Sequence, residues 1–394
     1  MIRITDSGAC TGCGACRALC PREAITMRRD ENGFFYPEVN LDLCAGCSLC
    51  ERSCPVDAAR AHPTPAAPRA YAVQNADTDT RERSSSGGVF ALLASAVLDA
   101  GGVVFGAAFS VDHRAVRHIA VRQKSELFRL LGSKYVQSET GDAYRQTKNF
   151  LEEGTPVLFG GTPCQVAGLY AYLKKEYPQL TTYDVVCHGV PSPLLWEKYL
   201  AFREECAGAP ARRVSFRDKK YGWRRYSLVI EFTNGKVYRK RHLLDPFMRA
   251  FLKNVTLRSS CFSCAFKGGK SGADLTLADF WGAENFASVP DDDSGTSLVL
   301  THSEKGAELF SRVFPDARVR EVNVAKALSH NGAFEHSADL PREREEFLSL
   351  ARERGVETAA RRFFPVSFSE KCRSAALDTR VGTMLQKRRQ KRKR

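Results

Sequence analysis

The sequence has no long hydrophobic run and no export signal. Its most apolar stretch, residues 88–98, is too short to span a bilayer and runs into Asp99. The first ten residues, MIRITDSGAC, lack the basic and apolar blocks of a secretion signal. We therefore do not expect an integral membrane protein, and we expect the chain in the cytoplasm.

Two further signatures are missing. There is no GxGxxG motif, so a dinucleotide-binding fold cannot be inferred by that route. Nothing resembles a base-reading module, and no nucleic-acid partner is expected in spite of a net charge of +14. Residues 387–394 carry seven of the 59 Lys and Arg residues, which leaves +7 on the rest. Such a segment is typical of a solvated end, or of one that docks on an acidic redox partner or an anionic membrane surface.

The composition is that of a globular protein with two or three domains. The 394 residues are 43% hydrophobic and 26% charged, which allows a sizeable core. Fourteen cysteines in a chain without an export signal indicate a reducing compartment and metal ligation rather than disulfides.

Eight of the cysteines form one pattern written twice. The two copies are Cys10-x2-Cys13-x2-Cys16-x3-Cys20-Pro21 and Cys44-x2-Cys47-x2-Cys50-x3-Cys54-Pro55. This spacing is typical of a bacterial ferredoxin with two [4Fe-4S] clusters, in which the fourth cysteine of each run binds the other cluster. Zinc ribbons use two CxxC pairs, and disulfides need an oxidising compartment. The pattern predicts one cluster on Cys10, Cys13, Cys16 and Cys54, and another on Cys44, Cys47, Cys50 and Cys20.

The rest of the chain indicates an α/β domain, so that the whole is an α+β protein. We expect the ferredoxin-type domain at 1–60, a Pro/Ala linker at 61–70, two parts of a second domain at 71–206 and 207–345, and a helical tail with a basic end at 346–394. Short β-rich runs alternate with amphipathic segments. The predicted helices are 87–100, 125–132, 140–152, 163–176 and 193–205; the predicted strands are 103–109, 118–122, 156–159, 181–187, 213–217, 226–233, 236–241, 275–280 and 297–301. The Asn234-Gly235 pair predicts a hairpin.

Four more cysteines stand at places suited to metal binding. Cys164 follows a predicted strand, with Thr162 and Pro163 suited to the N-cap and first position of a helix, whose positive end would lower the thiol pKa. Cys187 ends the next predicted strand, so both would lie at one carboxyl edge of the sheet. With the Cys261/Cys264 pair they form a candidate third [4Fe-4S] site. A zinc site, inert buried thiols or a redox disulfide are the alternatives. Cys206 and Cys372 have no partner spacing.

Two loops have the composition of a cofactor cradle. Ser84-Ser-Ser-Gly-Gly88 opens a predicted helix, and its free amides suit a phosphate or a flavin, although such turns also cap ordinary helices. Gly132-Ser-Lys-Tyr-Val-Gln137 adds a cation and an aromatic ring suited to a diphosphate and a planar group; the alternative is a plain helix end at Gly132.

Together these motifs resemble those of the beta-subunit family of coenzyme F(420) hydrogenase and dehydrogenase. The resemblance covers about residues 71–301 and rests on the following motifs in order: Ser85-Ser-Gly-Gly-Val89, Gly132-Ser-Lys-Tyr-Val-Gln-Ser138, Gly161-Thr-Pro-Cys-Gln165, Val186-Cys-His-Gly-Val-Pro-Ser192, Cys261/Cys264 and Asp279-Phe-Trp-Gly282. The resemblance implies FAD in the α/β domain, a nearby [4Fe-4S] cluster on Cys164, Cys187, Cys261 and Cys264, and hydride exchange with a planar acceptor such as coenzyme F(420).

The resemblance also implies residues for the cofactor site. The flavin-site candidates are Ser85, Ser86, Gly87, Gly88, Ser133, Lys134, Tyr135, Thr162 and Gln165. His188 is a candidate proton donor or orienting group, with a purely structural histidine as the alternative. We expect an FAD-dependent iron-sulfur oxidoreductase that works with a redox partner protein. Its main rival is a non-catalytic electron-transfer subunit of a larger complex; a metal-sensing regulator that binds nucleic acid through its basic tail is a more distant one.

Overall fold

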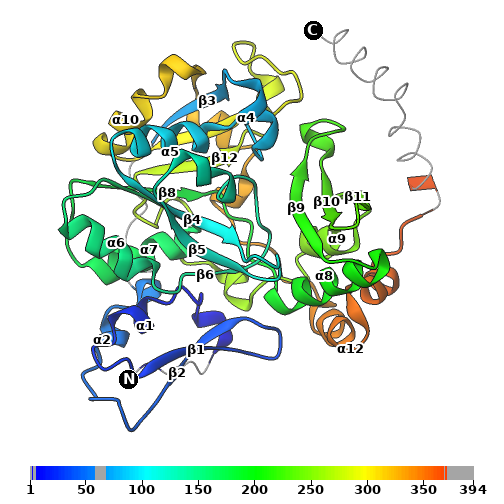
Figure 1. Cartoon of the computed structure of the whole chain (residues 1–394), viewed down its shortest axis with the longest axis horizontal. Coiled ribbons are helices and arrows are strands. Elements are labelled where there is room, and N and C mark those ends of the chain that lie inside the picture. Colours follow the sequence, from blue (N-terminus) through cyan, green and yellow to red (C-terminus); the bar gives the residue numbers. More distant parts are fainter. Residues whose placement is uncertain (1, 3–5, 58–67, 368, 371–394) are drawn as a thin grey trace.

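Figure 1 shows a computed structural model of the chain, which describes residues 2, 6–57, 68–367 and 369–370. The N-terminal unit, drawn in blue, consists of η1 (Ser7–Ala9), α1 (Ala15–Leu19), β1 (Ile25–Arg29), β2 (Phe35–Val39) and α2 (Leu49–Arg52). Its two strands pair antiparallel. Most of the predicted linker, Cys372 and the basic tail lie outside the described residues.

A nine-stranded mixed sheet forms the centre of the molecule. Its strands are β3 (Arg69–Asn75), β4 (Val103–Phe109), β5 (Val116–Val121), β6 (Ser138–Glu139), β7 (Val157–Gly161), β8 (Leu180–Val185), β12 (Leu275–Asp279), β13 (Ser297–Thr301) and β14 (Ala317–Val322). They are arranged in the order β14-β3-β13-β12-β8-β7-β4-β5-β6. The central strands β4, β7, β8 and β12 are parallel, so their carboxyl ends lie along one edge.

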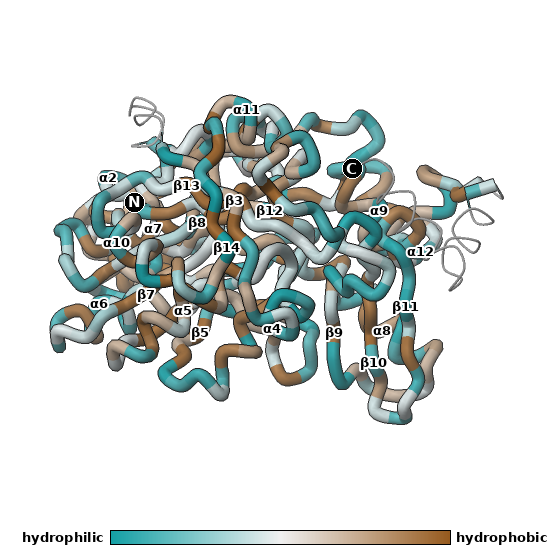
Figure 2. Tube along the Cα trace, turned by 90° about the horizontal axis from the view of Figure 1, so that it is seen from above, coloured by the Kyte–Doolittle hydropathy of each residue, from teal (hydrophilic) through white to brown (hydrophobic). Residues whose placement is uncertain are grey.

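Both faces of this sheet are buried, as the run of apolar residues in β4 requires. Val104 belongs to the hydrophobic cluster on one face, whereas Val103 and Phe105 belong to the cluster on the other. This is the alternation of a strand that is covered on both sides. Figure 2 shows hydrophobic stretches along the sheet and hydrophilic ones at many connecting turns. The covering elements are α4 (Thr78–Arg83), α5 (Val89–Asp99), η2 (Lys124–Arg129), α6 (Ala143–Glu152), α7 (Pro163–Leu173), α10 (Glu304–Ser311), η6 (Phe314–Asp316) and α11 (Val324–Leu328).

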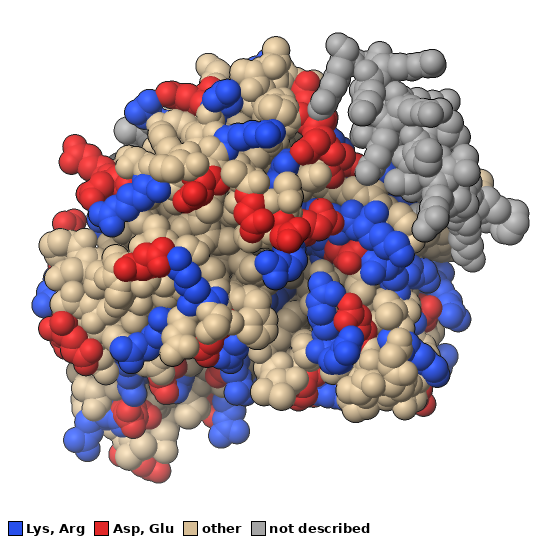
Figure 3. All heavy atoms as spheres, turned by 45° about the horizontal axis from the view of Figure 1, so that its top comes forward, with Lys and Arg blue, Asp and Glu red and all other residues tan. Residues whose placement is uncertain are grey.

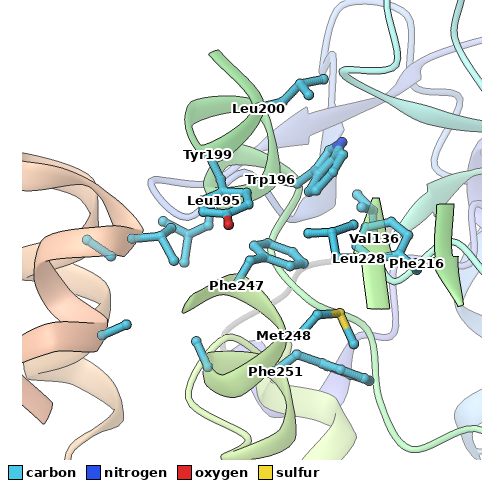
Figure 4. Packing of buried hydrophobic residues seen from close by; sticks show 14 of the residues in the cluster. Val136, Leu195, Trp196, Tyr199, Leu200, Phe216, Leu228, Phe247, Met248 and Phe251 are labelled. Carbon is cyan, nitrogen blue, oxygen red and sulfur yellow. The ribbon is translucent and has the colours of Figure 1, made fainter. Parts of the chain in front are cut away.

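A smaller three-stranded sheet lies beside the large one and packs against helices (Figure 1). It contains β9 (Ala211–Asp218), β10 (Ser227–Phe232) and β11 (Val237–Arg241), and it is accompanied by α8 (Pro193–Ala207), η3 (Trp223–Arg225), α9 (Pro246–Leu252) and α12 (Arg344–Phe363). Figure 4 shows Trp196, Phe216 and Phe247 packed together at its centre. The remaining short elements are η4 (Ser259–Ser263), η5 (Ala283–Asn285) and η7 (Gly332–Phe334).

Most predicted elements are present, and the predicted hairpin joins β10 and β11. Several features differ from the prediction. Residues 124–129 form a 3-10 turn where a helix over 125–132 was predicted, and β3, β6 and β14 are strands that the sequence did not predict. The strand β14 alternates exposed and half-buried residues, as suits the edge of a sheet. The helix α12 crosses residue 345 and packs on α8 and α9 instead of forming a tail.

On the face shown in Figure 3, Lys and Arg side chains are interspersed with Asp and Glu. Within the described residues, no helix has the length and hydrophobicity needed to cross a membrane.

Arg258 joins the N-terminal unit to the rest of the molecule. Its side chain is fully buried, and its guanidinium donates to the carbonyls of Cys10 and Phe35, each at 2.9 Å, and to Gln137 Oε1 at 3.3 Å. The same group lies 4.0 Å from the ring centre of Tyr36. Thr140 and Tyr144 also donate to Cys13 O. The first cysteine loop is therefore held by buried donors of the second domain.

Replacing Arg258 by Lys should loosen this junction. One ammonium group cannot reach three acceptors that a planar guanidinium spans, so buried carbonyls lose their partners. We expect the free energy of unfolding to fall by about 2 to 4 kcal/mol, measured by urea denaturation of anaerobically purified protein. The control is Arg28→Lys, because Arg28 makes an exposed ion pair with Glu38. If both substitutions lower the free energy of unfolding by the same small amount, Arg258 does not hold the N-terminal unit to the rest of the molecule.

Candidate cofactor site

Cys20, Cys44, Cys47 and Cys50, the set predicted for one cluster, line one small cavity. The Cys16 thiol is influenced by those of Cys10, Cys50 and Cys54, and the Cys13 thiol by those of Cys16, Cys164 and Cys10. The grouping of Cys54 with Cys10, Cys13 and Cys16 therefore stays a prediction. Burial raises the pKa of the Cys16 thiol to about 12.

The four later cysteines also meet. Cys164 is the second residue of α7, Cys187 lies two residues beyond β8, and η4 brings Cys261 and, at its end, Cys264. All four line one cavity. Because β7 and β8 are parallel neighbours, the loops after them emerge at the same edge, as the sequence predicts.

Two cations and the ferredoxin loop complete this cavity. Arg258 and Lys267 line it, and Lys267 Nζ donates to the carbonyls of Cys187 and Ala333, each at 2.7 Å. Thr11, which lies between Cys10 and Cys13, contributes to the same wall. Four thiolates on a cluster carry excess negative charge, which nearby cations stabilise. The donor set and its surroundings therefore fit an iron-sulfur cluster.

The expected low pKa of Cys164 is wrong. Burial, together with the neighbouring Cys264 and Cys261, raises the pKa of this thiol to about 12. Burial likewise raises the pKa of Cys261, to about 11, and of Cys187. The positive end of α7 does not compensate for the loss of water around Cys164. A metal must therefore displace protons from these thiols when it binds.

The kind of metal at the third cysteine site stays a prediction. In the part of the chain that is described, no group of three or more His, Cys, Asp or Glu side chains is arranged around a metal position, which favours neither zinc nor a cluster. Zinc takes four ligands at about 2.0–2.3 Å from one point, and the thiolates of a cubane bind four separate irons. The described cysteines are all free thiols.

Next to the cysteine cavity lies a much larger one of about 530 Å³, within the range of cofactor sites. The two predicted cradle loops form part of its wall and touch each other. Ser85 Oγ accepts hydrogen bonds from the Ser133 amide at 2.6 Å and from Ser133 Oγ at 2.8 Å. Lys134 Nζ donates to the carbonyls of Leu130, Leu131 and Gly132. Burial lowers the pKa of Lys134 to about 7.

Most predicted flavin-site residues border this cavity. They are Ser85, Ser86, Gly88, Ser133, Lys134, Tyr135, Thr162 and Gln165. Gly87 does not; it faces the sheet, where a Cβ atom would lie 2.2 Å from Val73 O. Its role is to let the loop approach β3 and β13. Thr162 and Gln165 form a capping box at the start of α7, and Gln165 Nε2 donates to Ser138, so these polar groups are largely used within the protein.

His188 stands where the two cavities meet. It lines both, together with Val185, Val186, Cys187, Gly189, Val190 and Ala333. Its Nε2 lies 2.6 Å from Asn254 Oδ1, which can only accept, so Nε2 carries the proton. Burial lowers the pKa of His188. Whether the ring handles protons or only orients its neighbours stays a prediction.

The sequence reasoning missed several residues of the large cavity. Arg217, Tyr226 and Phe251 reach it from β9, the start of β10 and α9, elements distant in sequence from the cradle loops. His118 also borders it, but both ring nitrogens have partners, Gly160 O and Ser138 Oγ. Asp279 and Trp281 belong to a motif that the sequence already singled out, and its place after a strand could have indicated a site.

Two parts of the chain match models of known protein families. Residues 154–326 match the family model for the C terminus of the coenzyme F420 hydrogenase/dehydrogenase beta subunit, and residues 9–58 match a 4Fe-4S dicluster domain. The predicted resemblance and the predicted two-cluster domain are confirmed. A solved structure of the F420-reducing [NiFe] hydrogenase complex from Methanosarcina barkeri is 13% identical, with a TM-score of 0.45 over 78% of this chain and 97% of that chain. No curated protein matches the chain.

Substituting Cys164 by Ser should remove one cluster only. If Cys164, Cys187, Cys261 and Cys264 hold a third cubane, anaerobically purified protein contains about twelve irons per chain, and the variant about eight. Iron and sulfide analysis with EPR of the reduced protein measures this. The control is Cys206→Ser, because Cys206 is exposed on α8. Native protein with about eight irons and one zinc, or a variant with unchanged iron, would show that the third site is not a cluster.

Proposed function

We propose that this chain, whose residues 154–326 match the coenzyme F420 hydrogenase/dehydrogenase beta-subunit family and follow a 4Fe-4S dicluster domain, is an FAD-dependent iron-sulfur oxidoreductase. It passes electrons between a redox partner and FAD, and exchanges hydride between FAD and coenzyme F420 or another planar acceptor. The observation that carries this proposal is the shared wall of the four-cysteine cavity and the large cavity.

The large cavity fits FAD in size and in chemistry. Its volume suits a dinucleotide, the positive charge of Lys134 and the loop amides suit a diphosphate, and Tyr135 provides an aromatic ring. When bound, FAD supplies the exchange between single electrons and hydride that iron-sulfur clusters cannot perform. The chain's own contribution is to hold the cofactor beside Cys187 and His188 and to keep water from the cysteine site.

The packing suggests an order for the three cluster sites. A Cβ atom on Gly168 of α7 would lie 3.3 Å from Cys13 Sγ, so the helix that begins beside Cys164 runs directly against the first cysteine loop. Cys54, Cys164 and Cys264 also share one hydrophobic cluster. The group with Cys10 and Cys13 is therefore the neighbour of the third site. The group with Cys20 and Cys44 lies farther along the path.

The distal group offers the contact point for a redox partner. Cys47 is exposed, and the loop before it presents Leu41 and Leu43, which are 64% and 46% exposed. An apolar rim around a cluster edge suits the small, transient interfaces of electron-transfer proteins. We propose that electrons enter or leave the chain here.

Reduction of the purified protein distinguishes an FAD-dependent enzyme from a non-catalytic electron-transfer subunit. An enzyme with its own acceptor site contains about one FAD per chain, and reduced coenzyme F420 bleaches the visible absorption of that flavin without any other subunit. A non-catalytic relay holds its clusters but shows no such bleaching until a partner protein is added. Protein that binds no FAD after reconstitution would refute the proposal.

Lys134 predicts a pH dependence of FAD binding. Its pKa is lowered to about 7 in the free protein, and a diphosphate favours the protonated form. Below pH 7 the lysine is already charged, so affinity is highest there. Above it, binding must take up a proton, and the dissociation constant should rise by up to about tenfold per pH unit.

Lys134→Gln should weaken FAD binding and remove this pH dependence, as fluorescence titration between about pH 6 and pH 9, on either side of the lysine pKa, would measure. The control is Lys124→Gln, because Lys124 makes only an exposed ion pair with Asp99. A pH-independent affinity in the native protein would argue against contact between Lys134 and the diphosphate.

A further inference from the structure

A second part of the large cavity adjoins the cradle loops and is built from residues of other elements. Arg217 comes from β9, Tyr226 precedes β10, and Asp279 and Trp281 follow from β12. Strand alternation explains why Arg217 faces the cavity: its neighbour Phe216 packs into the core on the other side (Figure 4).

The side chain of Arg217 is buried, and two of its nitrogen atoms have no hydrogen-bond acceptor. Only 4% of its side chain is exposed, and Nη1 donates to Asp279 Oδ2 at 2.7 Å and to the Tyr135 hydroxyl at 3.2 Å. Its Nε and Nη2 are buried and have no hydrogen-bond partner. An unused buried donor costs about 1–3 kcal/mol and is rare in a native protein. A charged group with two spare donors at a cavity wall indicates a missing acceptor.

An aromatic platform stands beside this cation. Trp281 is half-buried at the cavity wall, and the fully buried Trp223 stacks behind it with ring centres 4.6 Å apart and an angle of 11°. The Arg217 guanidinium lies 4.0 Å from the ring centre of Tyr226 and 5.4 Å from that of Trp281. Trp223 Nε1 donates to Ser85 O, so the platform is tied to the predicted flavin loop.

We propose that Arg217 and Trp281 form the binding site of the hydride acceptor, which is a planar aromatic compound carrying an anionic oxygen. A guanidinium offers paired donors that match a carboxylate, sulfonate or enolate, and an indole face binds a flat ring. The inference deepens the proposed function, whose acceptor it describes. The Asp279 carboxylate balances the charge of Arg217 and orients it through Nη1.

Two planar probes of different charge test this assignment. Anthraquinone-2-sulfonate and 2-(hydroxymethyl)anthraquinone share one ring system, and only the first is anionic. Their dissociation constants are measured on the full-length oxidised protein by quenching of tryptophan fluorescence. We expect the anionic probe to bind at least about tenfold more tightly, consistent with a charge-assisted hydrogen bond.

Variants then separate charge recognition from stacking. Arg217→Gln should abolish the preference for the anionic probe, and Arg217→Lys should keep part of it. Trp281→Leu should raise the dissociation constants of both probes by about fivefold, which corresponds to the loss of one aromatic contact. Arg318→Gln is the matched control, because Arg318 is exposed on the edge strand β14. Iron content and urea denaturation show which variants are folded. If Arg217→Gln does not fold, Arg217→Lys alone tests the recognition of the anionic group.

An unchanged preference in both Arg217 variants, or unchanged affinities in Trp281→Leu, would overturn the inference. Its failure is distinguishable from that of the proposed function. Protein that binds FAD but does not discriminate between the probes refutes only the acceptor site. Protein that discriminates between the probes but binds no FAD refutes the proposed flavoenzyme and leaves a binding site for an anionic aromatic compound.

Discussion

The arrangement of this protein depends on one buried cation, the guanidinium of Arg258. It spans carbonyls of Cys10 and Phe35 in the N-terminal unit and an amide oxygen of Gln137 in the second domain. The same side chain lines the cavity of Cys164, Cys187, Cys261 and Cys264. Buried charge is costly unless every donor finds a geometry that suits it, so this contact tolerates little movement. It therefore fixes the position of the first cysteine loop relative to the four-cysteine cavity.

Around that contact, the molecule forms a continuous series of sites. The exposed cysteine loop, the buried one, the four-cysteine cavity and the large cavity follow one another, and neighbouring members share residues or direct contacts. His188 and Cys187 belong to both cavities. The far end of the large cavity brings in the smaller sheet through Arg217. The smaller sheet therefore contributes to the large cavity, because it completes the wall that faces the cradle loops.

Burial changes the chemistry that local sequence suggests. The N-terminal position of Cys164 in α7 predicts an acidic thiol, yet desolvation and neighbouring cysteines raise its pKa. Lys134 shows the converse, since burial lowers its pKa although three carbonyls accept its protons. At neutral pH the Cys164 thiol is therefore protonated and Lys134 is about half protonated, so each is suited to change its protonation when a metal or an anion binds.

The sequence alone determined the features that depend on short spacing. The doubled cysteine runs, the hairpin at Asn234-Gly235 and the cap at Thr162 are local, since neighbouring residues fix their geometry. It also indicated that Cys164 and Cys187 share an edge, because parallel strands leave no other choice. Only the tertiary structure decided that Gly87 faces the sheet, that β14 closes its edge, and that Arg217 meets Trp281. Those facts depend on contacts between residues far apart in the chain, whose packing no local pattern encodes.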